Sequence, residues 1–507
     1  MKLSRYTLKN ISTDKVVVPD ESVFELPEKV LQFGTGVLLR GLPDYFIDKA
    51  NQQGIFNGRI VMVKSTSKGD TTAYDKQDGL YTQCLRGILN GTPVEENIIN
   101  SSISRVLNAA TEWKRVLECA HNSNLQVIIS NTTEVGIQLV NDDTRNHPPV
   151  SFPGKLLAFL FERFQAFGGS AKSGMVIIPT ELITDNGSKL QSIVLELAHL
   201  NSLPDEFIEW LENHNHFCNS LVDRIVPGKP SPEIKSAIES ELGYTDDLLI
   251  MSEVYRLWAI EGDENIKKIL SFAQADESVV IIPDIDFYRE LKLRLLNGTH
   301  TLSCGLAFLA GCETVNAAME DELVSQYIGN LMQFELAPNI PYSIETEEAI
   351  LFGEKVLERF RNPYIRHQWI NITVNYSAKM KLRCVPMLVN HYFKNDQVPE
   401  LFALGFAAYL FFMKPVSNKE NRYYGLHNGL EYLIDDEMAA TFYKRWTGLT
   451  VSALVKETLA DSEYWGADLQ LLPGLQQSIT DKLNQLLNSG VKAAIEDLAK
   501  IYQPDES

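Results

Sequence analysis

Cysteine is scarce in this chain, with six residues among 507, and no two of them form a C-x-x-C pair. A disulfide framework and a structural zinc site are therefore disfavoured, and a reducing compartment is expected. The first fifteen residues lack the apolar core of a signal peptide. The longest apolar run, residues 401–413, is too short to span a bilayer and predicts a buried helix instead. Together these absences favour a soluble, cytoplasmic protein.

Basic charge is also in short supply, because 46 lysine and arginine residues face 66 aspartate and glutamate residues, for a net charge of −20. A nucleic-acid partner normally requires a basic excess, so such a partner is disfavoured. Apolar residues make up 45% and aromatic residues 9% of the chain. This composition is typical of a globular protein and excludes a disordered or fibrous one. The length predicts two or three domains.

Short β-branched runs alternate with amphipathic helical stretches in the first half of the chain. The runs are residues 29–33, 59–63, 125–129 and 175–178, and the stretches between them include 113–119 and 155–164. This alternation predicts βαβ units and a mostly parallel sheet. From about residue 286 the apolar spacing becomes helical. We therefore expect an α/β domain over 1–285 and a mostly α-helical domain over 286–507, with a ligand cleft between them.

A glycine-containing turn follows the first predicted strand and opens a helical pattern, Phe33-Gly34-Thr35-Gly36 followed by Arg40. Gly34 allows a tight turn, and Gly36 lets the backbone approach a pyrophosphate at the helix N-terminus. The complete fingerprint has a third glycine where this chain has Leu39, so an ordinary strand-to-helix turn stays an alternative. In the first interpretation, the α/β domain is a Rossmann-type, dinucleotide-binding domain.

The end of the second predicted strand does not decide between NAD and NADP. A carboxylate there would bind the ribose 2′-hydroxyl of NAD, but Val63 is followed by Lys64, and Asp70 comes several residues later. Lys64 and Lys68 can favour a 2′-phosphate, or they can be solvated loop residues.

One predicted helix carries a lysine, an asparagine and a histidine, at positions 292, 297 and 300. At 100° per residue, Asn297 lies about 140° and His300 about 80° from Lys292, so the three share one half of the helix surface. A desolvated lysine can exchange a proton with an alcohol, and an amide can donate to the developing alkoxide. Gly298 lets a ligand or another backbone come close. The alternative is a solvated lysine, a capping asparagine and a structurally bonded histidine.

The combination of F-G-T-G-x-x-x-R-G with K-x-x-x-x-N-x-x-H resembles the mannitol dehydrogenase family, the polyol-specific long-chain dehydrogenases. Further segments agree over roughly residues 25–480, among them S-F-P-G-K-L at 151–156, V-D-R-I at 222–225 and R-N-P at 361–363. The resemblance implies a Rossmann-type domain followed by a mostly helical one. It also implies metal-independent, NAD-dependent interconversion of an alcohol and a ketone.

The resemblance also implies a role for individual residues. Lys292 would be the general acid and base, Asn297 and Asn186 the oxyanion-stabilising pair, and His300 a ligand of a substrate hydroxyl. Lys379 matches a substrate-binding lysine of the family. The residues expected to line the dinucleotide site are Phe33, Gly34, Thr35, Gly36 and Arg40, with Asn131 and Thr132 in the 130–134 segment beside the nicotinamide.

Departures from the polyol enzymes concern the substrate. Segments such as Q-D-G-L-Y-T at 77–82 favour a member that acts on a sugar acid, a uronate. The polyol enzymes tend to have a glutamate where this chain has Arg289, one turn before Lys292, and an arginine fork matches a carboxylate. Arg289 therefore either recognises the uronate carboxylate or forms a surface ion pair with a glutamate. Asp223 and Arg224 are either substrate contacts or a buried pair.

Alternatives to a uronate dehydrogenase stay open at two levels, the activity and the substrate. A protein that kept the fold but binds NAD(H) without turnover is the non-catalytic alternative, while fructuronate and mannitol are the alternative substrates. His214, His216 and Cys218 could be imagined as a metal site, but the helical context makes them structural. Hydrolase motifs of the H-E-x-x-H and G-x-S-x-G types are absent from the sequence.

Overall fold

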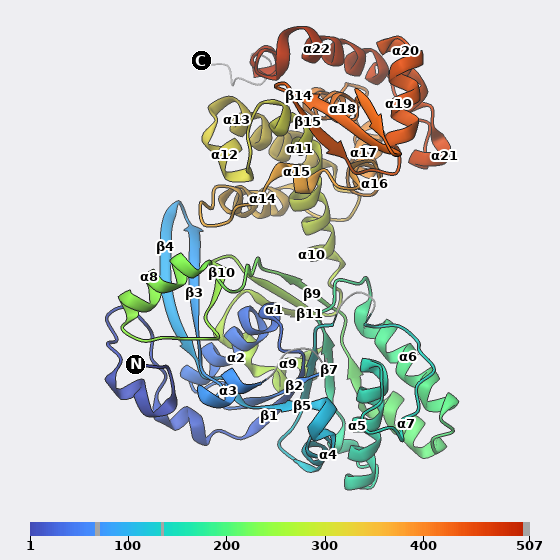
Figure 1. The fold of residues 1–507 in the computed structure, drawn as a ribbon. Helices are drawn as coiled ribbons and strands as arrows, with labels where there is room; N and C mark the ends of the chain where they lie inside the picture. The colour runs from blue at the N-terminus through green and yellow to red at the C-terminus, as the bar shows by residue number, and fades with distance from the viewer. Residues whose placement is uncertain (66–70, 133–135, 500–507) are drawn as a thin grey trace. The chain divides into compact units, whose positions relative to one another are not determined.

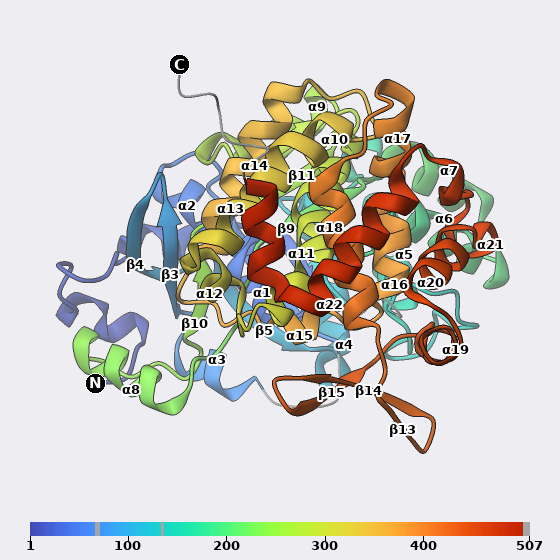
Figure 2. The same ribbon diagram turned by 90° about the horizontal axis from the view of Figure 1, so that it is seen from above.

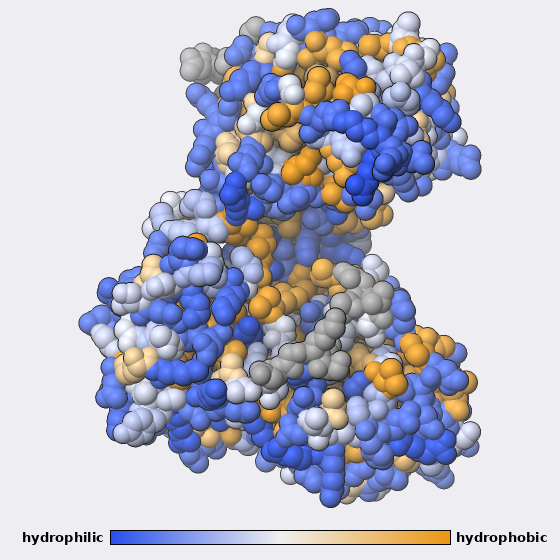
Figure 3. All heavy atoms as spheres, viewed as in Figure 1, coloured by the Kyte–Doolittle hydropathy of each residue, from blue (hydrophilic) through white to orange (hydrophobic). Residues whose placement is uncertain are grey.

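The computed structural model describes residues 1–65, 71–132 and 136–499. The chain divides into two compact units, Met1–Ile285 (unit 1) and Asp286–Ser507 (unit 2), which Figure 1 colours from blue to green and from yellow-green to red. On the face that Figure 3 shows, hydrophilic side chains cover most of the surface of each unit, as the excess of acidic residues leads one to expect. Among the described residues, no helix is both long and apolar enough to cross a membrane.

The main sheet of unit 1 has six parallel strands in the order β5-β2-β1-β6-β7-β8. The strands are β1 (Glu28–Phe33), β2 (Arg59–Lys64), β5 (Ile103–Asn108), β6 (Val127–Ser130), β7 (Val176–Pro179) and β8 (His216–Phe217). When β3 and β4 are left out as an inserted hairpin, this is the order 3-2-1-4-5-6 of the doubly wound dinucleotide-binding fold. The predicted Rossmann-type sheet is confirmed, and the four predicted runs correspond to β1, β2, β6 and β7, whereas β5 and β8 were not predicted.

Both faces of this sheet are buried, because its strands are apolar almost throughout. Leu31 and Phe33 of β1 pack on one side, while Val30 packs on the other, in a cluster with the fully buried Trp258. The helices of unit 1 are α1 (Val37–Gly41), α2 (Pro43–Gln52), α3 (Thr72–Lys76), α4 (Ala109–Glu118), α5 (Phe152–Phe167), α6 (Asn186–Leu200), α7 (Asp205–His214), α8 (Pro232–Leu242) and α9 (Glu264–Ile269). Short 3-10 turns lie at Arg5–Asn10, Glu21–Glu25, Cys119–His121, Ala171–Ser173 and Ser271–Ala275.

Two smaller sheets in unit 1 lie outside the predicted βαβ pattern. One has the order β10-β3-β4 and the other the order β12-β11-β9. Their strands are β3 (Tyr81–Leu89), β4 (Thr92–Asn100), β9 (Ser220–Asp223), β10 (Ile250–Glu253), β11 (Leu257–Glu261) and β12 (Val279–Ile282). The hairpin of β3 and β4 turns at Asn90-Gly91, where both residues have positive φ. Asn-Gly is the usual sequence signal of such a turn, and it is present here.

Unit 2 is mainly helical, as predicted. Its helices are α10 (Asp286–Leu291), α11 (Thr299–Leu309), α12 (Val315–Glu320), α13 (Glu322–Asn330), α14 (Thr346–Phe360), α15 (Trp369–Ile372), α16 (Tyr376–Lys379), α17 (Val385–Lys394), α18 (Glu400–Phe412), α19 (Ala439–Gly448), α20 (Val451–Leu459), α21 (Ser462–Trp465) and α22 (Leu475–Ala499), with 3-10 turns at Ala337–Asn339 and Leu469–Leu471. A small antiparallel sheet of β13 (Ser417–Lys419), β14 (Arg422–His427) and β15 (Leu430–Ile434) lies beside α19 (Figure 2).

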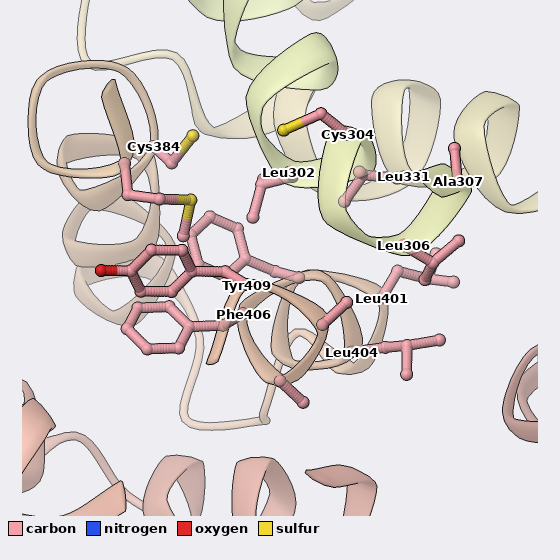
Figure 4. Packing of buried hydrophobic residues seen from close by; sticks show 14 of the residues in the cluster. Leu302, Cys304, Leu306, Ala307, Leu331, Cys384, Leu401, Leu404, Phe406 and Tyr409 are labelled. Atoms are coloured by element: carbon pink, nitrogen blue, oxygen red, sulfur yellow. The ribbon is translucent and has the colours of Figure 1, made fainter. Parts of the chain in front are cut away.

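The core of unit 2 is built around α18, which is buried on nearly every side and packs against α11 and α22. This confirms that the long apolar run forms a buried helix. Figure 4 shows the contact, with Leu302 and Leu306 of α11 near Leu401 and Leu404 of α18. Side chains of this kind hold α11 in place, and α11 carries one of the predicted site residues.

Three segments of unit 2 are π-helical, namely Lys292–Gly298, Leu331–Leu336 and Met380–Cys384. The first of them packs against both of the others. The predicted helix that carries residues 292, 297 and 300 is therefore α10, a π segment and α11 in succession, followed by Gly311 at φ +90°. The angular spacing assumed for an α-helix is wrong across this π segment. π-helical segments are rare in proteins as a whole, and many of those that occur lie at functional sites.

Candidate functional site

The glycine turn after β1 has the backbone that only glycine adopts easily. Gly34 has φ +132°, and its N–H donates to the Val63 carbonyl at 3.0 Å. A Cβ atom on Gly34 would lie 2.8 Å from the Leu39 side chain and 3.0 Å from the Asn131 carbonyl oxygen. Leu39, the departure from the three-glycine fingerprint, thus packs directly over Gly34. The close approach of β6 to this turn requires glycine here.

The turn and the segment after β6 lie together, as the sequence leads one to expect for neighbouring parallel strands. The Asn131 N–H donates to the Phe33 carbonyl at 3.2 Å, and its side-chain amide donates to the Thr180 carbonyl at 3.1 Å. Phe33 itself lies in the core, with its ring 5.3 Å from that of Phe152. Phe33 therefore contributes its backbone, and the structure brings Gly34 and Asn131 side by side.

A glutamate that the sequence patterns did not single out holds the same segment. Glu181 accepts hydrogen bonds from the Thr132 N–H at 2.8 Å, from the Thr132 hydroxyl at 3.0 Å and from the Ser130 hydroxyl at 3.2 Å. Burial raises the pKa of Glu181, while the bonds from Thr132 oppose that rise. Residues 133–135, which include the predicted Glu134, lie outside the described residues. Glu181 thus positions Thr132 at the end of β6.

Gly36 leaves room at the start of α1. A Cβ atom on Gly36 would meet no atom within 4 Å, although the residue is the N-cap of the helix. The neighbouring Thr35 carbonyl accepts a hydrogen bond from the Tyr74 hydroxyl at 3.3 Å. An uncovered glycine next to the N–H groups of a helix start is the space that a dinucleotide phosphate occupies in this fold. The residues present therefore fit a dinucleotide.

The side chain of Arg40 joins α1 to the segment before β10. It is buried, and Nη1 donates to the Leu248 carbonyl at 2.6 Å. The guanidinium also lies 5.2 Å from the centre of the Tyr81 ring. Its Nε is buried and has no hydrogen-bond partner among the described residues. The contact of Arg40 with the dinucleotide stays a prediction.

Asn186 is also bonded in a way that the sequence did not indicate. Its side-chain N–H groups point at the carbonyls of Pro179, Glu181 and Ser220, at 3.0–3.1 Å. Its Oδ1 accepts from the Ser220 N–H at 2.9 Å. An amide has two hydrogens, and in this structure both are directed at backbone carbonyls. Asn186 thus ties β7 to β9, and its role in stabilising an oxyanion stays a prediction.

The two remaining candidates of unit 1 are buried as well. Arg224 donates to the carbonyls of Gly41 at 2.6 Å and Glu253 at 2.9 Å and lies 4.7 Å from the Tyr45 ring centre. Burial lowers the pKa of Arg224 to about 10. Asp223 is buried at the end of β9. The burial of both residues agrees with the structural alternative, and a substrate contact of Asp223 or Arg224 stays a prediction.

At the end of β2, Lys64 is buried as the last residue of the strand. Lys68 and Asp70, which bear on the choice between NAD and NADP, lie outside the described residues.

In unit 2, Lys292 and Asn297 lie on the first π segment. Backbone hydrogen bonds in a π-helix link residues i and i+5, which is the spacing of Lys292 and Asn297. The angle between these two residues about the helix axis is therefore smaller than in an α-helix. Both side chains are half-buried. The Asn297 carbonyl accepts from the Thr301 hydroxyl at 2.7 Å, while its side-chain amide has no hydrogen bond to any described residue. The Asn297 amide is therefore available to donate, in contrast to that of Asn186.

Gly298 lets the Met387 side chain come close, while the predicted close approach of a ligand or another backbone stays a prediction. A Cβ atom there would lie 2.9 Å from the Met387 side chain and 3.9 Å from the Arg383 carbonyl. Arg294 bonds the carbonyls of Leu382 and Arg383 at 2.7 and 3.1 Å. The first π segment is thus joined to the third, Met380–Cys384, at this glycine.

His300 is buried among rings. Its imidazole stacks on Phe360 at 4.2 Å and meets the rings of His367 at 5.2 Å and Trp369 at 5.9 Å. Its Nε2 is buried and finds no hydrogen-bond partner in the described part of the chain. Burial, with added repulsion from nearby positive charges, holds the pKa of His300 well below its usual value. His300 is therefore neutral at pH 7, and its unpartnered nitrogen can bond a hydroxyl.

Three cationic side chains lie near enough to His300 for their charges to lower its pKa. The charges of Arg359, Arg383 and Lys379 all act on it. Lys379 donates to the Ile372 carbonyl at 2.9 Å, and burial followed by the charge of Arg383 lowers the pKa of Lys379. Sequence reasoning found only Lys379, because arginines at positions 359 and 383 have no distinctive spacing. Together Arg359, Lys379 and Arg383 form what we call the cation cluster.

Arg289, the predicted carboxylate ligand, forms an ion pair with Asp286 one turn earlier in α10. The pair involves an aspartate rather than the glutamate considered from sequence. The ion-pair alternative is thus formed with an aspartate, and binding of a uronate carboxylate by Arg289 stays a prediction. Among the described residues, no group of three or more histidine, cysteine, aspartate or glutamate side chains is arranged to hold a metal ion.

Comparison with known proteins places this geometry in a family. The mannitol dehydrogenase Rossmann domain matches residues 28–272, and the mannitol dehydrogenase C-terminal domain matches residues 284–487. The altronate oxidoreductase of Bacillus subtilis (strain 168) is 39% identical over 476 residues, covering 93% of this chain and 95% of the relative. That of Yersinia pestis is 35% identical, covering 92% and 96%.

Solved structures share the fold. Pseudomonas fluorescens mannitol 2-dehydrogenase, in a ternary complex with NAD and D-mannitol, has a TM-score of 0.66 at 22% identity, over 99% of this chain and 100% of the other. A substrate-free D-sorbitol dehydrogenase has a TM-score of 0.79 at 21% identity, over 97% and 100%. The chain therefore belongs to the mannitol dehydrogenase family and is a polyol or sugar-acid dehydrogenase.

Proposed function

We propose that the chain is an NAD(H)-dependent, metal-independent dehydrogenase that reduces D-tagaturonate to D-altronate, reversibly, in the degradation of galacturonate. The names of its 35–39% identical relatives support an altronate-type substrate. The observation that carries the proposal is the set of Lys292, Asn297 and His300 beside the cation cluster in unit 2. A uronate has a carboxylate that such a cluster can bind, whereas a polyol is uncharged.

In the proposed reaction, the bound nicotinamide supplies a hydride to the keto carbon of the substrate. The ammonium group of Lys292 gives its proton to the oxygen that becomes an alkoxide, so the ketone gains one hydride and one proton. The free amide of Asn297 donates to the same oxygen as its charge develops. Neutral His300 bonds a substrate hydroxyl through Nε2. In altronate oxidation Lys292 takes the proton back.

The dinucleotide would be held in unit 1 by the turn of Gly34 to Gly36 and by Asn131 and Thr132 at the end of β6. The helix start at Gly36 offers backbone N–H groups to the pyrophosphate. All six cysteines are unpaired and buried, which suits a reducing compartment, and we expect the enzyme in the cytoplasm.

A methyl group at Gly36 tests this cofactor site. In Gly36→Ala the methyl meets no protein atom within 4 Å, so the melting temperature should stay unchanged. The methyl would fill the space left for the phosphates, and the Kd for NADH should rise about tenfold or more. Fluorescence titration with NADH measures the affinity, and calorimetry measures the melting temperature.

Gly34→Ala is the comparison variant, in which stability should be lost. Gly34 has a positive φ, and a Cβ there would contact Leu39 and Asn131, so we expect the free energy of unfolding to fall by about 1–3 kcal/mol. NADH binding as tight in Gly36→Ala as in the wild type would place the phosphates elsewhere.

The reaction itself is tested by following NADH and NADPH oxidation with tagaturonate, fructuronate and fructose in parallel. We expect turnover with NADH, the highest kcat/KM for tagaturonate, and no effect of a chelator. Preference for fructuronate or fructose would overturn the substrate, and strong inhibition by the chelator would overturn the metal-independent mechanism. NADH binding without turnover on any of the three would point to a non-catalytic binding protein.

A further inference from the structure

We propose that Arg383 binds the carboxylate of the sugar acid and so determines the preference for a uronate over a polyol. The inference rests on the proposed function, since it assigns the charged end of that substrate to one residue. It also transfers to Arg383 the role that the sequence suggested for Arg289.

The side chain of Arg383 reaches the helix that carries the proposed hydroxyl ligand. Its Nη1 donates to the Thr301 hydroxyl at 3.2 Å, and that hydroxyl donates to the Asn297 carbonyl at 2.7 Å. Thr301 directly follows His300 in α11. The guanidinium therefore lies next to two of the groups assigned to the substrate, Asn297 and His300, without being one of the groups that exchange protons.

Arg383 differs from Arg289 and Arg294 in lacking a carboxylate partner among the described residues. Arg289 is paired with Asp286, and Arg294 with Glu290 at 2.8 Å. Within the part of the chain that the structure describes, Arg383 forms no ion pair, and its remaining donors are free for a ligand. A half-buried guanidinium without an anion is costly, and an arriving carboxylate would remove that cost.

A second cation, Lys379, lies near Arg383. Lys379 directly precedes the π segment that carries Arg383, and the two like charges repel, since the charge of Arg383 lowers the pKa of Lys379. The carboxylate whose charge reaches Lys379 is that of Asp436, which is held by the N–H and the hydroxyl of Ser377, both at 2.7 Å. An anion placed between Lys379 and Arg383 would relieve their repulsion.

The uncharged neighbours of Arg383 suit the rest of a sugar acid. Neutral His300 offers an unpartnered, buried nitrogen to a hydroxyl, and the Asn297 amide is free. Altronate and mannitol share a six-carbon polyhydroxy chain, and altronate has a carboxylate at one end. A planar guanidinium fork matches that carboxylate with two parallel hydrogen bonds, which a lysine does not reproduce.

The test compares Arg383→Gln and Arg383→Lys with the wild type on tagaturonate, fructose and fructose 6-phosphate. For Arg383→Gln we expect kcat/KM with tagaturonate to fall about 100-fold, mainly through KM, and fructose reduction to change less than about threefold. Arg383→Lys should recover only part of the loss, because it keeps the charge without the fork. Arg422→Gln, on the exposed surface of β14, is the matched control and should behave as the wild type.

Binding without turnover gives a second measure. Altronate without cofactor should raise the melting temperature of the wild type and of Arg422→Gln but not that of Arg383→Gln. An equal loss with tagaturonate and fructose would assign Arg383 a purely structural role and overturn the inference, as would an unchanged KM for tagaturonate. A preference for fructose 6-phosphate would make the ligand a phosphate instead. A wild type that reduces only fructose would overturn the proposed function itself, whatever the variants do.

Discussion

Replacing Lys292 with alanine should lower kcat for tagaturonate reduction by about 10²–10⁴-fold, because the alkoxide then has no positioned proton donor. KM for NADH should change little, since the cofactor residues belong to unit 1 and Lys292 to unit 2. Steady-state kinetics measure kcat, and fluorescence titration measures NADH affinity. Added primary amines should restore part of the activity, because a small ammonium ion can occupy the space of the lost side chain.

The control is Lys355→Ala, an exposed lysine of α14, which should leave kcat and KM unchanged. Loss of NADH binding in Lys292→Ala with kcat preserved at saturating NADH would assign Lys292 to the cofactor. A kcat within a factor of three of the wild type would remove Lys292 from proton transfer altogether.

The framework of the cofactor site was predictable because it depends on local signals. β1 is a short apolar run, and the turn that follows requires glycine at position 34 for its φ of +132°. Parallel strands that end at the same edge bring residues 34 and 131 together, whatever the rest of the fold. Alternation of strands and helices was therefore sufficient to predict four strands of the main sheet, β1, β2, β6 and β7, but not β5, β8 or the inserted hairpin of β3 and β4.

The roles of buried polar side chains were not predictable from residue type. Arg40, Asn186 and Arg224 all stand in family-like segments, and in all three the hydrogen-bond donors are directed at backbone carbonyls of distant segments. A sequence shows that a donor exists, but its partner depends on which carbonyls the tertiary structure leaves unbonded nearby. Glu181 was missed for the same reason, since its three bonds come from the end of another strand.

The arrangement in unit 2 escaped prediction for a different reason. The π segment at Lys292–Gly298 changes the angle per residue, so a projection with 3.6 residues per turn misplaces Asn297 relative to Lys292. Arg383 is adjacent to this segment because the third π segment packs against it, with Arg294 donating to the Leu382 and Arg383 carbonyls. The sequence has no periodic pattern that predicts either the π segment or the packing of the third π segment against it. Both features determine which side chains can contact the same substrate molecule.

Replacing Asn297 with alanine should lower kcat by about 10²–10³-fold and leave the melting temperature nearly unchanged. The reason is that its side-chain amide has no partner to lose among the described residues, while the developing alkoxide loses a donor. Asn186→Ala should show the opposite pattern. It leaves the carbonyls of Pro179 and Ser220 unbonded in the interior and should cost about 1–3 kcal/mol of stability.

Measuring kcat together with thermal unfolding for this matched pair separates a donor to the substrate from a positioning residue. Asn297→Asp adds a further check, because a carboxylate beside the alkoxide would repel its charge, and kcat should fall at least as far as in Asn297→Ala. If Asn186→Ala instead kept its stability and lost kcat as Asn297→Ala does, its amide would have to leave the backbone and donate to the substrate. The family resemblance would then have assigned Asn186 correctly, and the hydrogen bonds between β7 and β9 would be dispensable.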